Sequence, residues 1–231
     1  MFKLMMVFGL FGLVSSIGVA KEITTNEVTM ANAPSWLTQT RVEAVTDRIQ
    51  QKLEWSTRRV TVNWYGDIES FSKAHSLGPF AMAVTTRQGD TVTVHLGPLV
   101  NSENFDETFG HELVHVIVIQ KYKNAIPKWL EEGLANHVAK HPKVDYKWLV
   151  AQKPVDDVKN LAHPLLGSAS GIRYRYLASQ ALAEMLDKKC DLENLVRLSV
   201  GGKLEDYLAT TCEIPDINAA FATWVKAKST Q

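Results

Sequence analysis

The chain has 231 residues, and its 25 basic and 25 acidic side chains leave no net charge while the histidines are neutral. No excess of basic charge marks it as a nucleic-acid binder, and no acidic excess marks it as a ligand for basic surfaces. A hydrophobic content of 45% is enough for a core, and the length suits one domain or two closely joined lobes.

The first 20 residues have the layout of a secretory signal peptide. Lys3 precedes an apolar run over residues 4–14, and small residues follow, with Gly18 and Ala20 before the expected cleavage point. We therefore expect export to the periplasm or the exterior, without stable membrane insertion after cleavage. The alternative is an uncleaved anchor, because the run is almost long enough to span a bilayer.

The chain has only two cysteines, Cys190 and Cys212. An even number of cysteines in an exported protein favours a single disulfide. The alternative is a pair of buried thiols, because free cysteine is often found in protein cores.

Residues 21–34 are polar and show no periodicity, so they are predicted to form a lead-in segment, with core structure beginning near Ser35. From residue 36 to about Trp55 the apolar positions recur at helical spacing. This pattern predicts a long amphipathic helix, with Ser35 as its N-cap.

Three runs rich in β-branched and aromatic residues are predicted as strands: residues 60–65, 80–86 and 91–96. The last two are expected to form a hairpin. Beyond Asn101 the pattern is helical almost to the end of the chain. We therefore expect an α+β fold, with a mixed lobe carrying a short sheet over residues 35–123 and a mainly helical lobe over residues 124–231.

The sequence His-Glu-Leu-Val-His runs from His111 to His115, inside an apolar, proline-free stretch over residues 105–122 that is predicted as a buried helix. Residues four apart share a helix face, so both imidazoles can reach one metal, while Glu112 projects to the edge of that face. Zinc lowers the pKa of a bound water to about 7, and a neighbouring carboxylate can pass its proton to a leaving amine. The alternative is a chance pentapeptide whose histidines line a core.

Two histidines leave a zinc site short of a third protein ligand. A histidine six residues after the second is excluded, because Val118 and Lys121 occupy the glycine and histidine positions of that pattern. A glutamate from a following helix over residues 127–135 is the remaining solution, and an antiparallel return brings it level with the histidines. Periodicity does not decide between Glu131 and Glu132.

The His-Glu-x-x-His segment, followed by Trp-Leu-x-Glu-Gly-Leu-Ala at residues 129–135, resembles the gluzincin zinc peptidases, particularly the small peptidase-MA-like domains. In that family the glutamate directly before Gly-Leu-Ala binds zinc. The resemblance therefore implies Glu132 as the third ligand, and a single zinc metallopeptidase-like domain over residues 35–231.

The likeness covers roughly residues 105–226. A helix opening at Tyr176 and closing helices with a tryptophan, here Trp224, are similar to those of the family. His137 departs from it, because an aromatic residue is more common there. A helix over residues 176–189 and a second over residues 204–210 would end close to Cys190 and Cys212, if the helices between them pack antiparallel.

Two supporting roles are assigned with alternatives. Asn136 follows Glu132 by one helical turn, so its side-chain oxygen can accept the ring N–H of a zinc histidine, although asparagine also serves helix ends. Tyr176 is the first choice for stabilising an oxyanion, because a phenol donates to developing negative charge. Tyr174 and His163 are its rivals. No metal role is assigned to four other histidines: His75, His95, His137 and His141.

These patterns predict an exported zinc peptidase that hydrolyses a peptide or protein substrate, with Glu112 as general base and acid. Strand 91–96 is expected to position an extended peptide if it lies at a sheet edge. One alternative is a peptide- or partner-binding protein that keeps the gluzincin fold without turnover, although a binder has no need of Glu112. Another is an enzyme whose lead-in segment covers the cleft.

Overall fold

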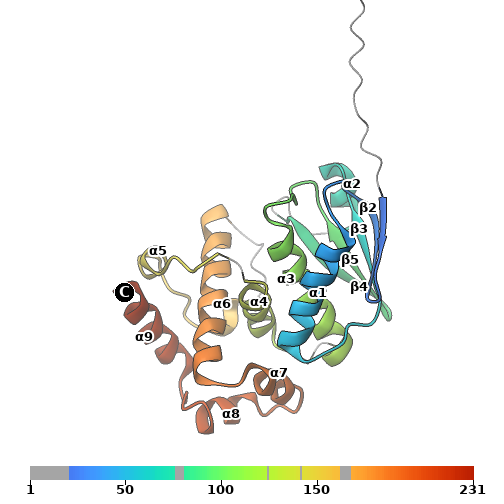
Figure 1. Cartoon of the computed structure of the whole chain (residues 1–231). Helices are drawn as coiled ribbons and strands as arrows, with labels where there is room; N and C mark the ends of the chain where they lie inside the picture. The colour runs from blue at the N-terminus through green and yellow to red at the C-terminus, as the bar shows by residue number, and fades with distance from the viewer. Residues whose placement is uncertain (1–20, 76–80, 124, 141, 162–167) are drawn as a thin grey trace, which may run out of the picture.

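The computed structural model describes residues 21–75, 81–123, 125–140, 142–161 and 168–231 (Figure 1). The predicted signal peptide lies outside this part of the chain, as do His141 and His163. None of the helices in the described ranges is both long enough and apolar enough to cross a membrane.

A five-stranded mixed sheet forms one side of the molecule, with the strand order β1-β2-β3-β5-β4. The strands are β1 (Lys21–Thr24), β2 (Val28–Ala33), β3 (Val60–Trp64), β4 (Ala83–Gln88) and β5 (Thr91–Leu96). Strands β2, β3 and β5 are parallel, whereas β1 and β4 are antiparallel to their neighbours. The predicted β4–β5 hairpin is confirmed.

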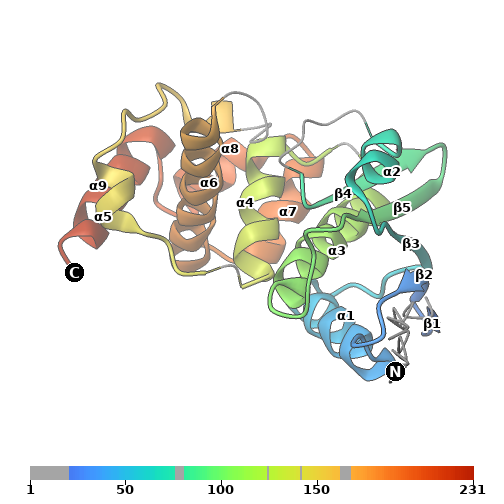
Figure 2. The same cartoon turned by 90° about the horizontal axis from the view of Figure 1, so that it is seen from above.

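Helices make up the rest of the described structure: α1 (Gln39–Leu53), α2 (Ile68–Lys73), α3 (Phe105–Tyr122), α4 (Lys128–Val138), α5 (Tyr146–Val150), the 3-10 helix η1 (Val158–Leu161), α6 (Ala169–Lys189), α7 (Leu192–Val200), α8 (Leu204–Thr210) and α9 (Ile217–Ser229). Helix α3 packs against β4, β5, α1 and α4, and α4 packs in turn against α6 (Figures 1 and 2). The predicted α+β class, with a sheet-containing part followed by helices, is confirmed.

The apolar periodicity explains the packing of α1 and β5. Val42, Val45 and Ile49 of α1 are buried at helical spacing, and Val92 and Val94 of β5 are buried at strand spacing. The cap of α1 is Thr38, whose side chain accepts a hydrogen bond from the backbone of Arg41. The predicted Ser35 cap is therefore wrong by three residues.

Residues 21–34 are not a lead-in segment, and the prediction that the core begins near Ser35 is wrong. Val28 and Met30 of β2 are fully buried, and β2 pairs in parallel with β3. In the sequence, the polar residues Thr29 and Asn32 obscure the alternation of buried and exposed side chains along β2. In the structure, a positive φ of 60° at Asn32 interrupts that alternation. Strands β1 and β2 occupy the edge of the sheet farthest from β4.

Helix α6 begins two turns earlier than the resemblance implied. Its N-cap is Ser168, whose hydroxyl accepts a hydrogen bond from the backbone of Gly171. Tyr176 therefore lies within the helix, where the backbone is held on both sides, and not at its first turn.

The predicted disulfide is confirmed. Cys190 caps the end of α6, and Cys212 follows α8, with a Cα–Cα distance of 5.1 Å between the bonded residues. This separation lies within the usual range for a disulfide. In the chain-entropy model, closing a loop of this length stabilises the fold by about 3 kcal/mol.

Candidate metal centre

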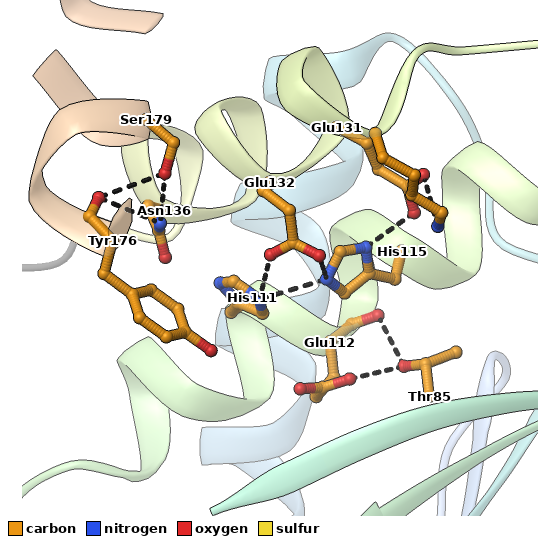
Figure 3. A network of polar contacts seen from close by, with 10 residues as sticks. Thr85, His111, Glu112, His115, Glu131, Glu132, Asn136, Tyr176 and Ser179 are labelled. Atoms are coloured by element: carbon orange, nitrogen blue, oxygen red, sulfur yellow. Dashed lines mark hydrogen bonds and ion pairs between the residues drawn. The ribbon is translucent and has the colours of Figure 1, made fainter. Parts of the chain in front are cut away.

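The histidines of the predicted motif lie on α3 and face α4 (Figure 3). One turn of helix separates His111 from His115, so their rings lie next to each other in a T-shaped, edge-to-face arrangement. The two Nε2 atoms are 3.0 Å apart. His111 is 7% exposed. Both Nε2 atoms are thus presented at one point on the buried face of the helix.

Glu132 reaches the same point from α4. Pro127 precedes the first residue of this helix as its N-cap, and the chain turns back after α3 so that the two helices pack together. The Glu132 carboxylate lies 3.7 Å from Nε2 of His111 and 3.8 Å from Nε2 of His115. These three residues form a group that can hold a metal ion, and it is the one such group found in the described part of the chain.

Gly133, the residue after Glu132, allows α4 to pack closely on α6. A Cβ atom added at Gly133 would lie 2.6 Å from the backbone oxygen of Ser179. Glycine is therefore required by the close approach of the two helices, and not by an unusual backbone angle. The small residue in the Glu-Gly-Leu-Ala segment sets the position of Glu132 relative to α6.

Replacing Gly133 with alanine is expected to lower the free energy of unfolding by about 1–3 kcal/mol, as in other overpacked cores. Urea denaturation of the metal-free protein measures this change. Gly66→Ala is the matched control, because a Cβ there meets no atom within 4 Å. Equal stability of the two variants would contradict the proposed close packing of α4 on α6.

Glu112 lies beside the three-residue group and is held by the neighbouring sheet. Thr85 of β4 donates a hydrogen bond of 2.6 Å to its carboxylate and a longer one to its backbone oxygen (Figure 3). Burial raises the pKa of Glu112 above its usual value, against the opposing effects of His115 and Thr85. The sequence offered no signal for Thr85 beyond its place in a strand.

Glu131 is held in a different way from Glu132. One carboxylate oxygen accepts a hydrogen bond of 2.7 Å from Nδ1 of His115, and the other accepts one of 2.7 Å from Nζ of Lys128. Burial alone would raise the pKa of Glu131, but these two partners lower it below its usual value. Glu131 thus contacts Nδ1 of His115, whereas Glu132 lies near Nε2 of the same ring.

The supporting role predicted for Asn136 is not found. Its amide nitrogen points to α6, where it donates to Oγ of Ser179 at 3.4 Å and to the backbone oxygen of Tyr176 at 3.5 Å. Its side-chain oxygen is buried and makes no hydrogen bond within the described structure. For His115, the hydrogen bond to the ring N–H that we expected from Asn136 is made by Glu131 instead.

Negative charge dominates the centre. Burial opposes a charge on His115, but the carboxylates of Glu132, Glu131 and Glu112 outweigh it and raise the pKa of His115 to about 9. A positive charge is therefore strongly favoured at this point.

Tyr176 reaches the same centre from α6. Its ring centroid is 6.4 Å from that of His111 (Figure 3). Burial, with a further contribution from Glu132 and Glu112, raises its pKa well above the ordinary value, so the phenol keeps its proton at neutral pH. Its rival Tyr174 accepts a hydrogen bond from the backbone of Val155 and does not line the cleft beside the metal centre.

A cleft of about 330 Å³ opens beside these side chains. His111, Glu112 and Tyr176 line it, and its walls are mainly apolar, including Met82 before β4 and Leu177 of α6. The cleft therefore brings one histidine of the candidate metal group, the buried Glu112 and the phenol-bearing Tyr176 to one accessible space.

The described histidines without a predicted metal role have other partners or positions. Nε2 of His137 lies 2.9 Å from the carboxylate of Asp187, and His95 contacts the hydroxyls of Tyr65 and Thr86. The ring of His75 packs against Phe71. These histidines do not belong to the metal-binding group.

Comparisons with protein-family models, with curated proteins and with solved structures found no match for this chain.

Proposed function

We propose that the chain is an exported zinc peptidase of the gluzincin type. The observation that carries the proposal is the convergence of His111, His115 and Glu132 on one point beside the buried carboxylate of Glu112. Catalytic zinc sites are commonly tetrahedral, with three protein ligands and one open position.

The donor atoms suit zinc in kind and in spacing. Imidazole nitrogen and carboxylate oxygen are its usual ligands, and bond lengths near 2.0–2.1 Å in a tetrahedron place ligand atoms about 3.3 Å apart. Here the two Nε2 atoms are 3.0 Å apart, and each lies close to a different oxygen of Glu132: His111 is 3.7 Å from Oε2 and His115 is 3.8 Å from Oε1. With one ligand atom taken from each residue, the three atoms lie within 4.8 Å of one another. The carboxylates of Glu132, Glu131 and Glu112 lie around His115, and this gathering of negative charge supports the binding of a cation.

When bound, zinc supplies a Lewis acid that polarises a peptide carbonyl and makes a water molecule more acidic. Glu112 would take a proton from the water as its oxygen bonds to the peptide carbonyl carbon, and would deliver that proton to the amine as the C–N bond breaks. Thr85 holds the Glu112 carboxylate in place. Tyr176 remains a protonated phenol and donates a hydrogen bond to the negative charge that develops on the substrate oxygen.

Strand β4 is the best candidate for holding an extended peptide. The predicted strand 91–96 is β5, which lies between β3 and β4, so the edge position that peptide pairing by this strand required is not met. Among the described strands β4 pairs only with β5, and Ala83 at its start lines the cleft. Its open edge can add a peptide strand through backbone hydrogen bonds.

Two alternatives receive less support. A binding protein without turnover has no need of a buried carboxylate held by Thr85 beside the metal ligands. An enzyme whose residues 21–34 cover the cleft is contradicted, because these residues form β1 and β2 at the opposite edge of the sheet. The Cys190–Cys212 disulfide supports export, because such bonds persist in oxidising compartments.

Metal analysis of the purified mature chain, followed by cleavage profiling on a mixed peptide library, tests the proposal. We expect one zinc ion per chain and cleavage that stops when a chelator removes the metal. A zinc-loaded chain that binds library peptides and cleaves none would favour the binding protein instead.

A further inference from the structure

Glu131 is a charged residue at a position where the helix pattern calls for an apolar one. It lies on the same stripe of α4 as Leu134, Ala135 and Val138, which are all buried, and Glu131 itself is 2% exposed. Burying a carboxylate is costly unless it is paired and hydrogen-bonded. Its presence in this stripe therefore requires a compensating interaction.

That interaction runs from the surface to a metal-binding histidine. The side chain of Lys128 is 51% exposed, and its Nζ donates to one oxygen of Glu131, while the other oxygen accepts from Nδ1 of His115. A carboxylate is only an acceptor. The contact therefore places a proton on Nδ1, so that Nε2, which faces Glu132, is the nitrogen available to bind a metal.

We propose that Glu131 is a positioning residue for His115, and that Lys128 acts on the metal centre through Glu131. The inference rests on the metal site of the proposed function. Carboxylates behind metal-binding histidines fix the tautomer and ring orientation and raise the basicity of the ligand. Lys128 keeps the carboxylate aligned and compensates its charge, so that a surface residue contributes to the metal affinity.

The test compares zinc dissociation constants of the full mature chain, measured by competition with a chromophoric chelator. Glu131→Gln is expected to weaken zinc binding by about 10- to 100-fold, the usual loss for such a partner. Lys128→Met is expected to weaken it by about two- to five-fold, the range for a partly exposed ion pair. In the Glu131→Gln background, Lys128→Met is expected to have no further effect.

The surface pair Lys159 and Glu205 is the matched control. Its atoms lie 3.2 Å apart, both side chains are exposed, and neither belongs to the metal-binding group. Lys159→Met and Glu205→Gln should leave the zinc dissociation constant unchanged. The visible absorption of the cobalt(II)-loaded protein should change in Glu131→Gln and stay the same in both controls.

Unchanged zinc affinity and an unchanged cobalt spectrum in Glu131→Gln would overturn the inference, whatever its melting temperature. Equal and additive losses from Lys128→Met in both backgrounds would overturn the role of Lys128. If Glu131→Gln does not fold, Lys128→Met must still bind zinc more weakly than Lys159→Met. A wild-type chain that binds zinc but cleaves no peptide would reject the peptidase proposal and leave these affinities as the test.

Discussion

Glu112→Gln is expected to lower kcat on a cleaved library peptide by about 10²- to 10⁴-fold, the usual contribution of a general acid or base. The amide is nearly the same shape and can still accept the hydrogen bond from Thr85, but it cannot take up a proton. Metal analysis should find zinc at the wild-type level. Steady-state kinetics of the zinc-loaded variant measure the loss.

Glu107→Gln provides the control for this experiment. Glu107 lies on the same helix but does not line the cleft, so its substitution should leave kcat near the wild-type value. Wild-type turnover in Glu112→Gln would remove Glu112 from the mechanism.

His115→Ala is expected to abolish stoichiometric zinc binding, and His111→Ala should do the same. Each change removes one of the three proposed ligands, and zinc sites in proteins use at least three. Glu132→Ala should also lose the metal, and the loss should exceed that in Glu131→Ala. Zinc content per chain after dialysis measures all four variants.

His137→Ala is the appropriate control, because His137 lies on α4 and pairs with Asp187 away from the centre. It should retain one zinc ion per chain. Full zinc content in both His111→Ala and His115→Ala would show that the metal binds elsewhere. A greater loss in Glu131→Ala than in Glu132→Ala would show that the two glutamates exchange roles.

The elements that carry the site were predictable because their patterns are long and uninterrupted. Helix α3 has the predicted bounds, since its apolar run contains no proline or internal stop. The β5 strand also matches, because its residues alternate strictly. The order of the strands was not predictable, because a parallel arrangement depends on contacts between distant segments, and this is why the sequence left open whether β5 lies at an edge.

The residues of the candidate metal group were predictable from helical spacing to the level of a choice between two glutamates. Helical spacing correctly placed Glu131 on a buried stripe of α4. Burial alone did not reveal whether its carboxylate faces the Nε2 atoms of the two histidines or, as found, Nδ1 of His115. The role of Asn136 was wrongly assigned, because one turn from Glu132 leads toward α6 and Ser179. Thr85 could not be identified, because its role depends on how β4 packs on α3.

The adjacency of α3 and α4 in the chain affects how much zinc can stabilise the protein. Two helices joined by a short turn form a local hairpin, and local contacts form early in folding. All three ligands lie in this hairpin, so a chain without its sheet still carries the complete donor set. Metal bound to such a chain reduces the gain in stability. Zinc should therefore raise the melting temperature less than its affinity for the native protein would suggest.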